Sequence, residues 1–313
     1  MGRAPPRKDS VDDQALLFSL TDLPIVARTP EKNFRSLQHP VWSEEKANLI
    51  QEYLRLFTFV TKHGNYIDGF AAPQRRHLSK LCSAALVLQT EPPWMRNFWL
   101  CDLDPKGVEL LEAIAEPHRS KIRQIDILPG DFNMTVDQVL ASPKITTKSA
   151  TFALLDQRTF ECAWSTVQKL AQHKPSLGQT DTKIEIFYFL ATGWLDRSIA
   201  AVGAPSTVDK LTRWWGRPDW KSLQGMQGIP RARLVAERFR KELGYVYARP
   251  YAIHNRRNGR TMYHMIHATD HDEAATLMLR AYRKISGRTD IDPTDKQVDM
   301  DELWREAEGV SVP

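Results

Sequence analysis

Five short apolar segments alternate with helical segments, and this alternation limits the possible fold more than any other feature. The apolar segments span residues 66–70, 98–102, 122–128, 151–155 and 184–190. The helical patterns between them cover residues 78–89, 106–115, 135–141 and 163–172. Because strands that alternate with helices form right-handed βαβ units, the pattern predicts a parallel sheet with helices on both faces.

Further helices are predicted before and after this alternation. A first helix, with Ser43 as its N-cap, is predicted to run to about residue 62. Residues 194–243 also look helical, and an amphipathic helix is predicted over residues 273–284.

A hairpin signal near the end of the chain narrows the kind of sheet. Two β-rich runs, residues 245–253 and 261–267, are joined by a loop that contains Asn258 and Gly259. An Asn-Gly pair between such runs is a strong hairpin signal. Five parallel strands followed by a hairpin make a seven-stranded sheet whose last strand runs antiparallel. This ending is typical of the class I methyltransferase variant, whereas dinucleotide dehydrogenases end in a parallel strand.

We therefore predict an α/β fold, with a Rossmann-like class I methyltransferase sheet and helices on both faces. The domain is expected to span residues 39–287, with a helical insertion at about 194–243. An N-terminal arm (1–38) precedes it, and an acidic tail (288–313) follows it with eight acidic and three basic residues. Since the net charge of the chain is +5, the remainder carries about +10. This excess favours nucleic acid or another polyanion as a partner, unless it is simply a basic surface.

Several features of the sequence bear on the cellular compartment. No run of ~18 apolar residues is present, and the first residues lack the apolar stretch of a secretory signal, so we expect no membrane association. Cys82, Cys101 and Cys162 are odd in number and form no CxxC pair. They fit neither a disulfide framework nor a zinc cluster, so we expect a cytoplasmic protein with reduced thiols.

An acidic residue stands at the end of each of the first four predicted strands. Ligands of open α/β sheets bind beyond these carboxyl ends. S-adenosylmethionine (SAM) has ribose hydroxyls, an adenine amino group and a cationic centre, which suit such a row of acids. We therefore predict SAM as the cofactor. The residues assigned to bind it are Asp68, Gly69, Phe70, Asp102 and Asp131.

Each of these acids also has a purely structural interpretation. Asp68 could instead cap the turn it enters, and Asp131 after a glycine could belong to an ordinary turn. Asp102 could cap the next helix, but Asp104, which stands before a proline, suits that role better. We therefore assign Asp102 to the ligand and Asp104 to the helix.

Asp156 and Arg158, after the fourth strand, are the predicted catalytic residues. They are expected to position the methyl acceptor, and Asp156 is the candidate base if the acceptor must lose a proton. No metal site is predicted. His264 and His267 are spaced so that they fall on opposite faces of a strand, which suits structural roles.

The predicted hairpin is rich in arginine. Its basic residues are Arg249, Arg256, Arg257 and Arg260, with Tyr251, His254 and Tyr263 between them. Arginine contacts phosphates and aromatic rings stack on unpaired bases, so this segment is a candidate nucleic-acid-binding surface. A charged hairpin tip that keeps a sheet edge soluble is the equally weighted alternative.

Four segments together resemble the three-Cys-motif partner family (TcmP). They are HPVWSEEK (39–46), YIDGFA (66–71), LDQRTFEC (155–162) and YHMIHAT (263–269). The family is similar to class I SAM-dependent methyltransferases, and the cysteines in its name belong to a radical-SAM-like partner protein. The resemblance therefore implies such a partner. The chain departs from usual SAM-binding loops in having Ala71, Ala72 and Pro73 where glycines are common.

Three functions are consistent with these patterns. The first is a SAM-dependent methyltransferase that acts on a nucleic acid or a nucleotide-like group. The Asn/Asp-Pro-Pro-Tyr/Phe motif that grips nucleobase amino groups is absent, so amino-methylation of that kind is not predicted. The second is a hydrolase that uses the acids to bind Mg²⁺ and cleave a phosphodiester. The third is a non-catalytic partner module that has lost SAM binding.

Overall fold

The computed structural model describes residues 44–73, 82–174, 183–192, 195, 199, 205–226, 228–255 and 259–287. The predicted arm (1–38) and acidic tail (288–313) lie outside these residues, and the predicted domain boundaries stay predictions. Within the described part of the chain, no helix has both the length and the apolar character needed to cross a membrane.

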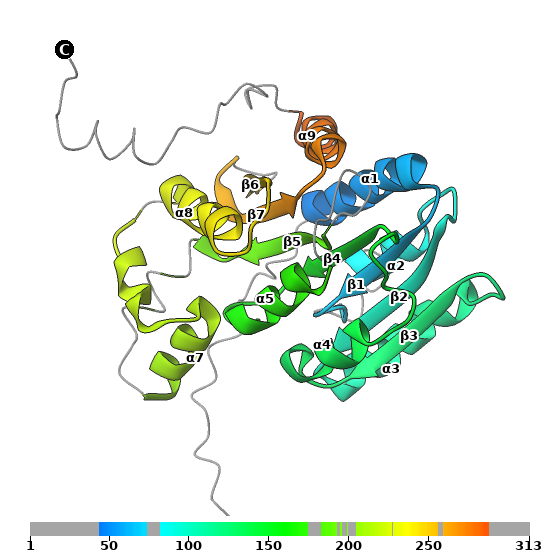
Figure 1. The fold of residues 1–313 in the computed structure, drawn as a ribbon, viewed down its shortest axis with the longest axis horizontal. Helices are drawn as coiled ribbons and strands as arrows, with labels where there is room; N and C mark the ends of the chain where they lie inside the picture. Colours follow the sequence, from blue (N-terminus) through cyan, green and yellow to red (C-terminus); the bar gives the residue numbers. More distant parts are fainter. Residues whose placement is uncertain are drawn as a thin grey trace, which may run out of the picture. The chain divides into compact units, whose positions relative to one another are not determined.

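Seven strands form one sheet, with helices packed against it (Figure 1). The strands are β1 (Gly64–Asp68), β2 (Met95–Asp102), β3 (Gln124–Pro129), β4 (Thr151–Leu155), β5 (Glu185–Leu190), β6 (Tyr247–His254) and β7 (Thr261–Thr269). The α-helices are α1 (Glu44–Thr61), α2 (Ser83–Leu88), α3 (Pro105–Ala115), α4 (Phe132–Leu140), α5 (Trp164–His173), α7 (Pro205–Trp215), α8 (Gly228–Lys241) and α9 (Asp272–Ser286). The 3₁₀ helices are η2 (Glu116–His118) and η3 (Pro218–Leu223).

The strand order is β3-β2-β1-β4-β5-β7-β6. The first five strands are parallel, and β7 runs antiparallel to both β5 and β6. This order confirms the predicted class I methyltransferase sheet. We call the edge at which β1 to β5 end the carboxyl edge. Since the chain crosses from β3 back to β4 beside β1, the switch in strand order places the ends of β1 and β4 next to each other on this edge.

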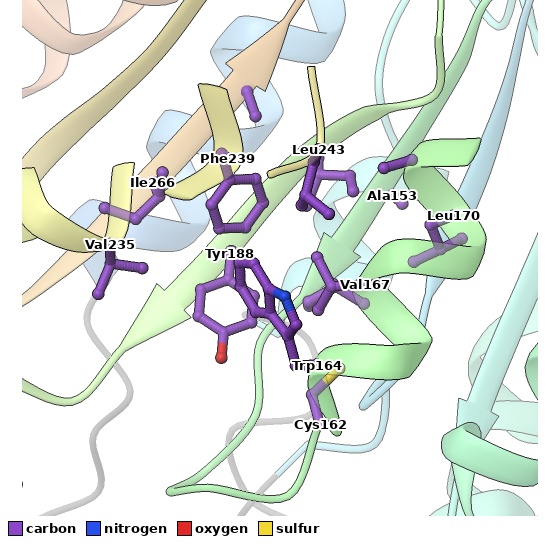
Figure 2. Close-up of a cluster of buried hydrophobic side chains, with 14 of the residues drawn as sticks. Ala153, Cys162, Trp164, Val167, Leu170, Tyr188, Val235, Phe239, Leu243 and Ile266 are labelled. Atoms are coloured by element: carbon purple, nitrogen blue, oxygen red, sulfur yellow. The ribbon is translucent and has the colours of Figure 1, made fainter. Parts of the chain in front are cut away.

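Neighbouring residues of each strand serve opposite faces of the sheet. On β1, Ile67 joins a core with α4, α5, α7 and α8, whereas Tyr66 joins a core with α1, α2, α3 and α9. Figure 2 shows part of the first core, where Trp164 stands edge-on to Phe239 with 5.4 Å between ring centroids. Such near-complete burial on both faces explains why β5 reads as an almost continuous apolar run.

Arg238 of α8 ties the helical insertion to α5. Its guanidinium carbon lies 3.9 Å from the ring centroids of both Trp164 and Trp215. The same group donates a hydrogen bond to the carbonyl of Trp215 (2.8 Å) and is paired with Glu242 (2.7 Å). A cation between two aromatic rings is strongly held once it is removed from water.

Some predicted boundaries of strands and helices were wrong. The first strand ends at Asp68 rather than residue 70, because the carboxylate of Asp68 accepts a hydrogen bond from the amide of Phe70 and turns the chain. Helix α4 begins at Phe132 rather than residue 135, because Asp131 caps it. In both cases a local side-chain bond, which competes with continued regular structure, decides the boundary.

Candidate functional site

A pocket lies at the carboxyl edge, beside the ends of β1 and β4. Its wall is formed by Lys46, Asp68, Phe70, Ala71, Ala72, Pro73, Cys82, Ser83, Asp156 and Arg158. The structure thus brings together four of the predicted site residues, Asp68, Phe70, Asp156 and Arg158. Asp102 and Asp131, predicted for the same ligand, lie outside this wall.

Asp68 is a buried carboxylate at the end of β1. It accepts hydrogen bonds from the amide of Phe70 (3.1 Å) and the hydroxyl of Tyr66 (3.0 Å), and it is 1% exposed. Burial raises its pKa to about 7, and the nearby charges of Asp156 and Asp102 act in the same direction. Asp68 therefore caps its own turn and also lines the pocket, so the two interpretations of this residue are compatible.

The turn after Asp68 is packed tightly against α4. A Cβ atom on Gly69 would lie only 2.6 Å from the ring of Phe132, so the turn has no room for a side chain there. Phe70 then packs its ring against the same Phe132 at 6.1 Å between centroids and lines the pocket. The backbone can pack closely on α4 here because Gly69 carries no side chain.

Asp102 and Asp104 divide their roles at the end of β2. The carboxylate of Asp102 accepts hydrogen bonds from the amides of Ala72 and Asp104, both at 2.9 Å, and the residue is 7% exposed. Asp104 accepts from the amide of Lys106 at 3.2 Å, which confirms it as the N-cap of α3. Asp102 thus holds the loop after β1, and its predicted role with a ribose stays a prediction.

Asp131 is the N-cap of α4. It accepts from the amide of Asn133 (2.9 Å) and from the side chain of the same residue (2.7 Å). Two apolar side chains stand close to these acids in sequence: Leu103, which is 72% exposed, and Met134, which is 77% exposed. Neither residue is in the wall of the pocket.

Lys46 and Asp156 form an ion pair inside the pocket wall, with 2.5 Å between Nζ and Oδ2. Their side chains are only 2% and 16% exposed. The Nζ atom also lies 5.9 Å and 5.7 Å from the ring centroids of Phe189 and Tyr263. Burial raises the pKa of Asp156, and the charge of Lys46 opposes this rise.

Lys46 is the functional candidate that sequence reasoning missed. A signal was present, because helical spacing places Lys46 on the same side of α1 as Ile50 and Tyr53, which are both fully buried. A lysine within a buried apolar stripe needs an acidic partner nearby. The identity of that partner, 110 residues away in sequence, is a matter of tertiary structure.

Gln157 and Arg158 differ in their surroundings. Gln157 is 1% exposed; it donates to the carbonyl of Phe189 (3.1 Å) and accepts from the amide of Cys162 (2.9 Å). It thereby fixes the loop that follows β4. Arg158 is exposed and lines the pocket, while its backbone amide donates to Glu161 (2.7 Å). Arg158 can therefore meet an anionic group of a bound molecule.

The prediction that aromatic residues of the hairpin are exposed for base stacking was wrong. Tyr251 and Tyr263 are each 1% exposed, because they belong to the core that includes residues of α9, and His254 is 8% exposed. Arg249 and Arg260 lie toward opposite ends of the hairpin. Arg249 stands opposite His267 in the strand register, near the start of β6, whereas Arg260 lies in the connection between β6 and β7. Arg256 and Arg257 lie outside the described residues. Phosphate binding by these arginines stays a prediction.

The two histidines of β7 lie on opposite faces, as predicted. His267 is hydrogen-bonded to Glu185 (3.2 Å), and His264 is hydrogen-bonded to Thr192 (3.0 Å). Burial lowers the pKa of His264 to about 4, so it is neutral at neutral pH. Within the ranges that the structure describes, no three His, Cys, Asp or Glu residues are grouped so as to hold a metal ion.

Comparison with known proteins gives structural likenesses only. No protein-family model and no curated protein matches the sequence. An O-methyltransferase from Bacillus cereus in complex with S-adenosylhomocysteine (SAH) is 12% identical, with a TM-score of 0.44 over 73% of this chain and 81% of that chain. TomG, an O-methyltransferase from Streptomyces achromogenes in complex with SAM, is 10% identical, with a TM-score of 0.43 over 73% and 80%. Human methyltransferase-like protein 13 in complex with SAH is 11% identical, with a TM-score of 0.38 over 82% and 96%. The fold assignment above rests on the strand order.

Proposed function

We propose that this protein binds SAM at the carboxyl edge and transfers its methyl group to an acceptor. The observation that carries the proposal is the pocket beside the ends of β1 and β4, with the carboxylates of Asp68 and Asp156 in its wall. The sheet has the methyltransferase strand order, and open α/β sheets bind ligands at this switch in strand order.

The residues of this edge fit the separate parts of SAM. Asp68 and the turn at Gly69 suit the amino-acid end, which carries an ammonium group. Asp102 suits the ribose hydroxyls, because each carboxylate oxygen can accept a second hydrogen bond. Leu103 and Met134 offer exposed apolar surface for the adenine ring, and Asp131, which caps α4 close by in sequence, suits its amino group.

The cofactor supplies a methyl group on a positively charged sulfur, so the protein's main task is to align an acceptor with it. Asp156 would take a proton from the acceptor at a carboxylate oxygen. Because burial raises its pKa, it is a stronger base than an exposed aspartate. Arg158, exposed and in the pocket wall, would hold an anionic group of the acceptor.

The acceptor that fits this charge pattern best is a nucleic acid or a nucleotide-like group. The +10 charge of residues 1–287 and the four hairpin arginines support this choice. The resemblance to the three-Cys-motif partner family adds a radical-SAM-like protein as the partner with which the chain would act. Affinity for RNA that falls with rising salt, and falls further in Arg249→Ala and Arg260→Ala, would support the assignment.

A second candidate is a partner module that no longer binds SAM. It is favoured by the loop of Ala71, Ala72 and Pro73, which is held against Asp102 by the amide of Ala72. A Cβ atom on Gly107 would lie 2.6 Å from the Cβ of Ala72, so this loop is also tightly packed against α3.

Isothermal titration with SAM and with SAH separates the two candidates. If the protein is a methyltransferase, we expect binding in the micromolar range, about −8 kcal/mol. Asp102→Ala should weaken it at least tenfold, whereas Asp104→Ala, two residues away and serving only as a helix cap, should leave it unchanged. Absence of heat with a folded protein would refute the enzyme and leave the partner module.

A further inference from the structure

We propose that Lys46 is a methylation site of this protein, modified in cis by SAM bound in the same pocket. The proposal rests on the function proposed above. It starts from the wall of the pocket, which Lys46 lines together with Asp68 and Phe70, and where its Nζ atom pairs with Asp156 of the same wall. The primary amine of Lys46 therefore belongs to the same pocket wall as the residues that would hold the amino-acid end of SAM.

Lys46 is the best nucleophile in this wall. The thiol of Cys82 is held protonated, because burial raises its pKa to about 11. The hydroxyl of Ser83 is an intrinsically weaker nucleophile than an amine, and the guanidinium of Arg158 stays charged. An aliphatic amine needs only to lose its proton, so it does not need the motif that grips nucleobase amino groups.

Asp156 is in place to receive that proton, at 2.5 Å from Nζ. The raised pKa of Asp156 favours this transfer, since burial penalises the charged carboxylate. The nitrogen lone pair then attacks the methyl carbon, the carbon–sulfur bond breaks with its electrons moving to sulfur, and SAH leaves. The product is N-methyl-lysine, formed directly as its charged ammonium, and Asp156 passes the proton it received to solvent, so the net reaction releases one proton.

The surroundings of Nζ suit the product as well. The rings of Phe189 and Tyr263 lie at 5.9 Å and 5.7 Å, within the distance at which aromatic faces attract a cation. Methylated ammonium groups are bound by such aromatic walls together with a carboxylate. The site would therefore retain the modified side chain rather than expel it.

Because the side chain of Lys46 is buried, we expect the protein to methylate itself rather than to be modified by another enzyme. The side chain of Lys46 is 2% exposed, so a separate enzyme could not reach Nζ without unfolding the start of α1. By contrast, Lys62, just after the same helix, is exposed. Lys62 serves as an internal control for non-specific chemical methylation.

The test is incubation of the full chain with SAM, followed by intact mass and peptide mapping. The expected result is one methyl group per chain or more, on the peptide of Lys46 and not of Lys62, at a rate independent of protein concentration. Excess SAH should suppress it. Lys46→Arg should abolish the mass increase and Asp156→Asn should slow it at least tenfold, whereas Lys62→Arg should change neither the mass increase nor the SAM binding that calorimetry measures.

Two results overturn the inference, and they are distinguishable. If calorimetry shows SAM binding but the mass is unchanged, or the methyl group lies elsewhere, Lys46 is not the acceptor and the proposed function stands. If SAM does not bind to the folded protein, the proposed function and this inference fall together.

Discussion

The carboxylate of Asp102, at the end of β2, accepts a hydrogen bond of 2.9 Å from the backbone amide of Ala72, in the loop after β1. Its other oxygen accepts from the amide of Asp104. A side chain that would meet the ribose thus also fixes the loop beside the pocket. If Asp102 binds the ribose as we propose, loop geometry and ligand binding are coupled through this one residue.

This coupling predicts a large effect of Asp102→Ala on stability. The change leaves two amides without their charged acceptor, which should lower the free energy of unfolding by about 2–4 kcal/mol. Asp104→Ala removes only a helix cap and should cost about 1 kcal/mol. Urea denaturation of both variants measures the difference. Equal losses would show that the bond to Ala72 does not hold the loop.

The contact between the loop of Ala71, Ala72 and Pro73 and helix α3 predicts that a second substitution restores the stability lost through a first one. Gly107→Ala places its Cβ 2.6 Å from the Cβ of Ala72, and neither group can move freely. The variant should lose about 1–3 kcal/mol of stability through overpacking, although alanine is the better helix former. Adding Ala72→Gly removes the clash, so the double variant should return to within about 1 kcal/mol of the wild type. A double variant as unstable as Gly107→Ala alone would contradict the packing argument.

The raised pKa of Asp68 predicts a pH dependence of stability. The native carboxyl, with a pKa of about 7, holds its proton more tightly than the unfolded chain, whose value is near 3.8. The stabilisation is fully present below pH 4 and is lost as pH rises through 7. Asp68→Asn keeps the shape without the charge, and its amide can donate to the hydroxyl of Tyr66.

Asp68→Asn should therefore gain stability relative to the wild type as pH rises, by about 1–3 kcal/mol between about pH 5 and about pH 8. Asp156, whose pKa is also raised, is present in both proteins, so it largely cancels from the difference. Chemical denaturation at both pH values measures the effect. A difference that does not change with pH would show that Asp68 stays ionised throughout.

Two arginines of α8 provide a matched pair. Arg238 is buried between Trp164 and Trp215, and Arg238→Ala should cost about 3 kcal/mol because Glu242 and an aromatic cage lose their cation. Arg240, partly exposed and paired with Glu237, should cost under about 1 kcal/mol when changed to alanine. Thermal unfolding of both variants tests this, and similar losses would refute the role of the cage.

Local patterns alone were enough to predict the elements and the sheet. The alternation of strands and helices, the Asn-Gly loop and the cap at Asp104 each depend on residues close together in sequence. For the same reason, the sequence placed Asp68 and Asp156 at strand ends. Parallel strands end on one edge, so their position at the carboxyl edge followed from the fold class.

Only the tertiary structure decided which of these groups meet and which are exposed. Lys46 reaches Asp156 because α1 packs over the sheet beside the end of β4, and no local pattern encodes that contact. Asp102 is engaged by Ala72 for a similar reason. Tyr263, which looked available for stacking, is buried because its face of β7 is covered by the core that includes residues of α1 and α9. Burial and long-range pairing depend on how distant elements pack. These contacts decide which of the acids at the strand ends line the pocket.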